Sequence, residues 1–278
     1  MQIPYYPLPS NPENEIKFGM PTVADAMSYS GASLDQEEAI TTRYLNEMQR
    51  SDDKSDACLW TAQDRRTALW WIFCHSRLDT VLTVSYQCSY CGEEHYFDVD
   101  MRTLEMTAGL LTVEPFIPVS IPVNGQPYEW VLKPLDGRAM EHLEAARSCL
   151  PEASDPSFKE ESINLRLMEL AHQAHLKEQP LDFLEAAQLR YELIKQMTAE
   201  SEFSPLVAQI ELMNRTLAHG LAMKIEKGQA NLLLPPHPCP KSAGKEDSDI
   251  KVTNLYFPFR NIDFLPDFRS QWMAGINN

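Results

Sequence analysis

Two cysteines with the spacing of a zinc knuckle carry the clearest chemical signal in this sequence. Cys88 and Cys91 are separated by two residues, and Gly92 follows the second one. Two thiolates at this spacing, followed by glycine, are typical of a turn that holds half of a tetrahedral zinc site. No second C-x-x-C pair occurs in the chain. A complete site would therefore need two further ligands from elsewhere in the sequence.

The residues on both sides of this pair alternate between apolar and polar side chains. Leu82, Val84 and Tyr86 alternate with polar residues before the pair, and the segment 94–101 alternates after it. A period of two is typical of half-buried strands, so the sequence predicts a β-hairpin with the two cysteines at its tip. A redox-active pair would instead lie at a helix N-terminus in a βαβ setting. The strands favour metal binding over redox chemistry, with an inert turn as the other alternative.

A second turn could supply the missing ligands. His237 and Cys239 lie in the proline-rich segment 235–240, which follows an apolar stretch that reads as a strand. Three cysteines and one histidine form a ligand set that suits zinc. We therefore predict zinc bound by Cys88, Cys91, His237 and Cys239, provided that the two turns meet in space. The alternatives are that 235–240 is only a rigid loop, or that the rival ligands His95 and Cys58 complete the site.

The other cysteines and histidines give weaker signals. Cys74 falls on the aromatic face of a predicted helix and is typical of a core residue, and Cys149 carries no signal. Glu169, His172 and His175 are spaced by three along a predicted helix and could in principle share a metal. Histidines on a helix are more often solvated or capping residues, so we do not expect a metal there.

The composition describes an acidic chain. The 40 Asp and Glu residues outnumber the 24 Lys and Arg residues, which gives a net charge of −16. Such a surface argues against binding to nucleic acid or anionic lipid, since both need clustered positive charge. No apolar window of about 20 residues is present, and the N-terminal residues lack the pattern of a signal peptide. We expect a soluble, intracellular protein whose cysteines are reduced.

No enzymatic arrangement stands out. The ten glycines do not cluster into a phosphate-binding loop, and neither a G-x-S-x-G nor an H-E-x-x-H motif occurs. A metallohydrolase would need an open coordination position on the metal and a general base, for which Glu93 and Glu94 would be the candidates. We therefore expect that the protein is not an enzyme.

The remaining pattern predicts an α+β fold, with amphipathic helices packed on small antiparallel hairpins. Helical spacing of apolar residues predicts one helix after Pro134 and others at about 33–49, 61–77, 157–176, 181–198 and 204–225. Thr61 with Asp64 resembles a capping arrangement at the start of the helix 61–77. Strands at 116–123 and 128–132 flank Asn124-Gly125, a pair suited to a type I′ turn. Further strands are expected at 230–234, where prolines end the strand, and around 250–256.

Four segments are expected along the chain. They are a proline-rich arm and helix (1–55), a helix with the cysteine hairpin (56–110), a β-hairpin followed by helices (111–200), and a helix with the second cysteine turn and an aromatic end (201–278). The prolines before residue 22 favour an extended arm over a core element. Its Tyr5, Tyr6 and Leu8 could be buried against a partner.

The order helix, strand, cysteine-bearing turn, strand occurs twice in the sequence. The first copy runs from residue 61 to 101 and the second from about 206 to 259. Both helices contain an arginine-threonine pair, Arg66-Thr67 and Arg215-Thr216. This weak internal echo aligns the Cys88–Cys91 turn with the His237–Cys239 turn, which is why these two turns are expected to meet.

The block from Leu69 to Leu104, an apolar helix and a C-x-x-C-G hairpin ending in Phe-Asp-Val-Asp-Met, resembles baseplate hub and hub assembly proteins of T-even-like contractile-tailed phages. Members pair such a block with a later helix, a second cysteine-bearing turn and an aromatic segment. The corresponding parts here are 217–220, the 237–239 turn and 257–266. The segment 118–138 is similar to strand-turn-helix openings in phage tail assembly proteins. The second cysteine pair of the family is not intact in this chain.

This resemblance implies a structural or assembly role in a contractile tail, without catalysis. Zinc would stabilise a hairpin that is too small to fold alone, and the arm and helices would contact other tail or baseplate proteins, with assembly in multiple copies. The expected location is the host cytoplasm during assembly, and a place in the baseplate of the virion stays open. The alternative is a cellular zinc-ribbon-like adaptor of a transcription or translation complex.

Overall fold

The computed structural model describes residues 2–31, 33–51, 54–226, 229–242 and 251–267. Helices pack on small antiparallel sheets of two or three strands, which confirms the predicted α+β class. The helices are α1 (Val23–Tyr29), α2 (Glu37–Met48), α3 (Ala62–Ser76), α4 (Gly137–Ser148), α5 (Phe158–Gln173), α6 (Phe183–Lys195) and α7 (Ser204–Thr216). The strands are β1 (Tyr6–Leu8), β2 (Asn11–Ile16), β3 (Val81–Gln87), β4 (Glu94–Asp100), β5 (Ile117–Ser120), β6 (Glu129–Leu132), β7 (Ala174–Leu176), β8 (Met223–Glu226), β9 (Gln229–Pro238) and β10 (Val252–Pro258).

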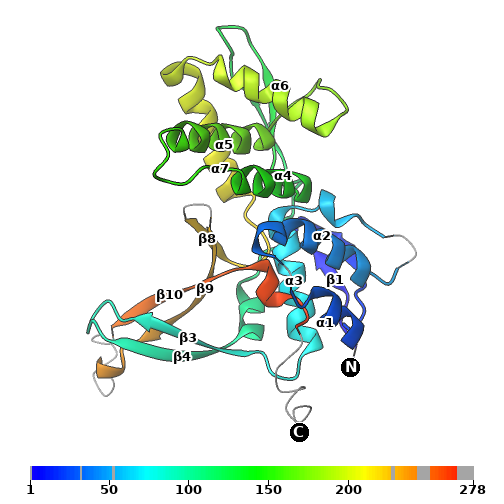
Figure 1. Cartoon of the computed structure of the whole chain (residues 1–278), viewed down its shortest axis with the longest axis vertical. Helices are drawn as coiled ribbons and strands as arrows, with labels where there is room; N and C mark the ends of the chain where they lie inside the picture. The colour runs from blue at the N-terminus through cyan, green and yellow to red at the C-terminus, as the bar shows by residue number, and fades with distance from the viewer. Residues whose placement is uncertain (1, 32, 52–53, 227–228, 243–250, 268–278) are drawn as a thin grey trace.

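Two hydrophobic cores divide the molecule. The first is built from residues 3–104 together with 221–265, and the second from residues 111–217. We call these parts the body and the inserted lobe, because the chain leaves the body, forms the lobe and returns. Figure 1 shows α4–α7 stacked above the body, while β3–β4 and β8–β10 project from the body to one side.

The two crossings between body and lobe lie side by side. Gly109 donates its N–H to the Gly220 carbonyl at 2.9 Å, and Gly220 donates back to Gly109 at 2.7 Å. The N-terminal hairpin joins them, since the Leu111 N–H donates to the Pro9 carbonyl at 2.8 Å. Three segments that are far apart in the sequence therefore form one neck. The neck fixes the lobe without a long linker.

A buried polar network lies under this neck. The Asp64 carboxylate accepts the Ser10 N–H at 2.8 Å and the Ser10 hydroxyl at 2.6 Å. His219 Nε2 lies 2.7 Å from the Thr61 hydroxyl, and the His219 and Asp64 side chains are fully buried. Because buried polar groups are costly unless they are paired, this network specifies how α3, the N-terminal hairpin and the returning chain meet.

Gly220 is a position where a side chain cannot be accommodated. Its φ is +67°, and a methyl group would lie 2.2 Å from Thr67 Oγ1 and 3.2 Å from the Gln63 carbonyl oxygen. Thr67 cannot withdraw freely, because its hydroxyl accepts the Leu221 N–H at 3.1 Å. We predict that Gly220→Ala lowers the free energy of unfolding by about 2 kcal/mol or more, through backbone strain and this clash.

Gly125→Ala is the matched control for this substitution, measured by the same chemical denaturation. Gly125 has a φ of +73° but no heavy atom near the position of an added methyl group. It should therefore show only the strain of the left-handed backbone, about 1 kcal/mol. Equal losses for the two variants would contradict the proposed close packing at the neck.

Several local predictions are confirmed. Thr61 and Asp64 form a reciprocal capping box at the start of α3. The strands β3 and β4 form the predicted hairpin, with the two cysteines in the turn between them. Asn124 and Gly125 both have positive φ, as a type I′ turn requires. Each of these features depends on residues only a few positions apart.

The N-terminal segment is extended but is not an arm outside the core, so that part of the prediction was wrong. It forms the hairpin β1–β2, and Ile3, Tyr6 and Leu8 are buried in the body core. Tyr6 also donates its hydroxyl to the Asp64 carbonyl at 2.8 Å. The prolines set the extended backbone, whereas the apolar residues between them find partners on α3.

The elements after α4 differ from the prediction mainly at their ends. The helix expected to reach residue 176 ends at Gln173, and the next three residues become β7, which pairs with β6. The strand expected to stop before Pro235 continues as β9 to Pro238. The strand can continue through these prolines because β8 pairs only with residues 229–232. Along the prolines, that side of β9 therefore has no partner strand among the described residues that would accept a hydrogen bond from the N–H groups that proline lacks.

Candidate metal centre

Four potential metal ligands converge where the hairpin β3–β4 meets β9. The ligand atoms of Cys88, Cys91, His95 and Cys239 all lie within 4.8 Å of one another. His95 Nε2 is 3.1 Å from Cys91 Sγ. In a tetrahedral zinc site with the usual bond lengths, ligand atoms are about 3.5–3.8 Å apart. These four side chains would therefore need only small shifts to enclose a zinc ion.

The turn between β3 and β4 has the geometry of a metal-binding knuckle. Gly92 has a φ of +73° and donates its N–H to the Cys88 carbonyl at 2.9 Å, while the Cys88 N–H donates to the Glu93 carbonyl at 2.9 Å. This closed turn directs both sulfurs to the same side. Glycine is needed after the second cysteine, because other residues are strained at this backbone conformation.

The knuckle favours the thiolate form of its first cysteine. The backbone N–H groups of Cys91 and Tyr90 donate to the Cys88 sulfur and lower the pKa of Cys88 to about 6. The pKa of Cys91 is raised, because desolvation and the nearby Cys88 and Cys239 sulfurs outweigh a favourable hydrogen bond from the Glu93 backbone. Three sulfurs crowded in this way repel as anions, and a divalent cation would relieve that repulsion.

His95 enters the site from strand β4. It lies four residues after Cys91 and points inward with Phe97 and Val99, because side chains alternate along the strand. Its ring packs 5.8 Å from the ring of Tyr86, the residue opposite it on β3. The sequence prediction named His95 only as a rival ligand. The sequence signal that favours it is the alternation along β4, which places His95 on the same inner face as Phe97 and Val99, at the end of the strand next to the cysteines.

Cys239 comes from the end of β9, about 150 residues later in the chain. Its N–H donates to the Lys251 carbonyl at 2.7 Å, and its carbonyl accepts both the N–H and the hydroxyl of Ser242, at 2.8 and 2.7 Å. These bonds hold the buried sulfur against the knuckle. The structure thus brings Cys239 to Cys88 and Cys91, as the internal echo suggested.

His237 lies outside this group of four. Its ring packs 4.0 Å from Phe97 and 5.8 Å from Tyr86, between the two hairpins. Burial, followed by the nearby His95, lowers the pKa of His237. The structure therefore brings together three of the four predicted ligands, the three cysteines. The fourth ligand position, expected for His237, is taken by His95.

The other candidate residues are placed elsewhere. Cys58 lies in a short turn before α3, where burial and then Asp56 raise its pKa to about 11. Cys74 is buried in the body core, and Cys149 is exposed. His172 Nε2 contacts His142 Nδ1 at 2.8 Å. Within the described residues, the Cys88 group is the single cluster of ligand atoms close enough to share a metal.

An ion pair and a threonine hydroxyl lie beside the site. Lys241, which follows β9, forms an ion pair with Glu93 in the turn between β3 and β4. Glu93 raises the pKa of Lys241, and the Cys91 and Cys239 sulfurs add a smaller effect in the same direction. Thr253 Oγ1 lies 3.7 Å from Cys88 Sγ. Three thiolates and one neutral imidazole around a divalent ion would carry a net charge of −1, and Lys241 neutralises the further negative charge of Glu93 beside them.

We predict that Lys241→Ala weakens zinc binding by about tenfold, the lower end of the range for outer-shell residues, because Lys241 is exposed. The measurement is competition with a chromophoric chelator. Lys224→Ala is the control, since Lys224 forms a similar exposed pair with Glu226 on β8. Equal zinc affinities for wild type and Lys241→Ala would show that the lysine is not coupled to the metal.

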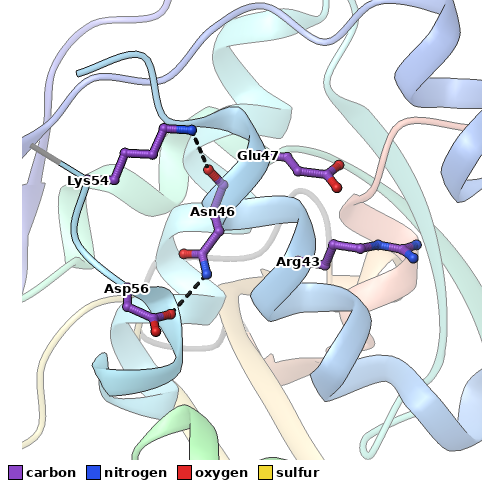
Figure 2. Close-up of a pocket in the computed structure, with 5 residues that line it drawn as sticks. All are labelled: Arg43, Asn46, Glu47, Lys54 and Asp56. Carbon is purple, nitrogen blue, oxygen red and sulfur yellow. Dashed lines mark hydrogen bonds between the residues drawn. The ribbon is translucent and has the colours of Figure 1, made fainter. Parts of the chain in front are cut away.

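A polar depression beside α2 has a structural explanation. Figure 2 shows Arg43, Asn46, Glu47, Lys54 and Asp56 around it. Asn46 donates to Asp56 at 2.9 Å, and Lys54 lies 3.5 Å from the Asn46 carbonyl. Arg43 lies over the Tyr29 ring and Glu47 accepts the Tyr29 hydroxyl. These contacts hold α1 against α2, and they hold the segment that follows α2 against the same helix.

No helix in the described part of the chain is long and apolar enough to cross a membrane. No protein-family model matches the chain, and no curated protein and no solved structure matches it either.

Proposed function

We propose that this protein is a non-enzymatic structural or assembly component of a phage contractile-tail baseplate, and that it binds one structural zinc ion. The metal part rests on one observation, the convergence of Cys88, Cys91, His95 and Cys239. Four protein ligands leave no coordination position open for a substrate or a reacting water, and such closed sites are structural. Three soft thiolates and one imidazole suit zinc better than magnesium or calcium.

The zinc would join two parts of the body that are distant in the sequence. Three ligands come from the hairpin β3–β4 and the fourth from the end of β9. The two-stranded sheet β3–β4 is too small to be stable alone, although its inner face shares a core with the three-stranded sheet through residues such as Val84 and Leu255. In such a site the free energy of metal binding contributes to the free energy of folding.

The baseplate role is supported by the resemblance of 69–104 and 217–266 to hub and hub assembly proteins of T-even-like phages. A fold of two cores with a protruding metal-bearing pair of sheets is compatible with a protein that acts through contacts. The proposed partners are other tail and baseplate proteins, met in the host cytoplasm during assembly. Nucleic acid and membranes are not proposed as partners, in keeping with the charge of −16.

The test of this role is purification of the tagged protein from infected cells, followed by mass spectrometry. We expect tail or baseplate proteins with wild type and with Cys149→Ser, which alters an exposed cysteine outside the site. Cys88→Ser should lose them, because it removes a ligand. Recovery of a transcription or translation complex in their place would support a cellular zinc-ribbon-like adaptor and overturn the baseplate role.

A further inference from the structure

Both edges of the hairpin β3–β4 are unpaired in the described residues, because the two strands pair only with each other. The β4 edge is the one that carries acidic residues, Glu94 and Asp98. The Cys88 N–H donates to the Glu93 carbonyl, and the Met101 N–H donates to the Thr80 carbonyl. Hydrogen-bonded and non-hydrogen-bonded pairs alternate in an antiparallel ladder, so these two bonds fix the direction of every backbone group between them.

Glu94, Tyr96 and Asp98 are three of the four residues of β4 whose backbone groups consequently point away from β3, whereas the backbone groups of the intervening residues face β3. The fourth, Asp100, ends the strand, and its carbonyl already accepts the Thr103 hydroxyl at 2.7 Å. An open row of N–H and C=O groups is a template for another strand. Figure 1 shows β4 along the lower side of the projecting hairpin.

The same three residues expose their side chains on the outer face. Tyr96 is 69% exposed, and Glu94 and Asp98 are also exposed. A strand added at this edge would place alternate side chains about 5 Å from them. Two carboxylates that flank an aromatic ring complement Lys or Arg, through charge and through contact with the ring.

The inner face of β4 determines which side chains suit the remaining alternate positions of an added strand. His95, Phe97 and Val99 point toward β9 and β10. The remaining side chains of an added strand would extend this inner face beside the partly buried Phe97. Apolar residues fit that position, because they would cover apolar surface that is otherwise open to water.

We propose that the free edge of β4 is a docking site for an extended segment of a partner protein, in which Lys or Arg alternate with apolar residues. This inference deepens the proposed assembly function and rests on it, since it names the chemistry of one contact. A second copy of this chain fits poorly. Antiparallel β4–β4 pairing centred on Tyr96 would place Glu94 of each copy opposite Asp98 of the other, and like charges directly opposite are destabilising.

Two proline variants test the edge itself. Tyr96→Pro removes an outward N–H and blocks strand addition at β4, but it leaves the hydrogen bonds to β3 intact, as proline is tolerated on edge strands. Ser85→Pro is the matched control. Ser85 is the residue opposite Tyr96, and its N–H points outward from the β3 edge. Metal content should be the same in both variants.

The probe is a fluorescent seven-residue peptide of alternating Lys and Val with a central Tyr, and its anisotropy is measured with zinc-loaded protein. We expect binding to wild type and to Ser85→Pro, and affinity at least about tenfold weaker for Tyr96→Pro. Binding should weaken with salt, and the same peptide with Glu in place of Lys should not bind.

The inference is overturned if the Lys peptide fails to bind wild type, if both proline variants lose equal affinity, or if the Glu peptide binds as well. These results would not contradict the assembly role, because that role is tested separately by purification from infected cells. If Tyr96→Pro still recovers tail proteins while the peptide result is negative, the assembly role stands and only this docking site is rejected.

Discussion

His95→Phe should abolish stoichiometric zinc binding, whereas His237→Phe should leave it unchanged. His95 is one of the four converging ligands, and His237 packs its ring between Phe97 and Tyr86. Loss of a ligand should weaken zinc binding by more than the 10–100-fold typical of outer-shell changes. The two substitutions are matched, because phenylalanine keeps an aromatic ring at each position.

Chelator competition on the reduced, zinc-loaded proteins measures this difference. A result in which His237→Phe loses zinc and His95→Phe keeps it would restore the ligand set predicted from the sequence. Equal loss for both would mean that packing between the hairpins matters more than the choice of histidine. Only a loss confined to His95→Phe agrees with the geometry of the site.

Cys239→Ser should separate the two sheets that carry the proposed zinc ligands and destabilise the body. Cys239 is the sole ligand in the site that does not come from the hairpin β3–β4. Structural zinc contributes about 10–16 kcal/mol of binding free energy in small zinc-finger peptides, so the loss here should reach several kcal/mol. That is a large part of the stability of an ordinary domain, about 5–15 kcal/mol.

Hydrogen exchange should locate this effect. Amides of β3, β4 and β9 should exchange faster in Cys239→Ser, while those of α5 and α7 in the inserted lobe should change little, because their side chains belong to the second core. Cys149→Ser should match wild type everywhere. Unchanged protection in β3, β4 and β9 would contradict the proposal that a metal holds these strands together.

Short-range features were predictable from the sequence because their signals are local. The knuckle residues Cys88 and Cys91, the capping box at Thr61 and the turn at Asn124-Gly125 each depend on neighbours in the chain. The backbone preferences and spacing that produce these features are present in any short window. The place of Cys239 near these two cysteines was predicted less directly, from the repeated order of helix, strand, cysteine-bearing turn and strand.

The fourth ligand could not be chosen from the sequence. His95 and His237 both lie within four residues of a cysteine in the sequence, and both rings lie on the side of β3–β4 that faces β9. Which one reaches the sulfurs depends on how the sheets are stacked, and the stacking depends on contacts among core residues such as Leu232. Local patterns in a single sequence do not show which of these residues meet.

The neck and the N-terminal hairpin were missed for a related reason. Gly109 and Gly220 are 111 positions apart and carry no local signal of pairing. In the first 22 residues, the proline content suggested an arm, but the buried Tyr6 and Leu8 decide the outcome through contacts with distant helices. Tertiary packing outweighs local preference in both cases.

X-ray absorption at the zinc edge, on freshly purified and reduced wild-type protein, is the most direct test of the central claim. With one zinc per chain confirmed by elemental analysis, we predict a shell of three sulfurs at about 2.3 Å and one nitrogen at about 2.0–2.1 Å. These correspond to Cys88, Cys91, Cys239 and His95. Protein without bound metal, or a shell with only two sulfurs, would contradict the account.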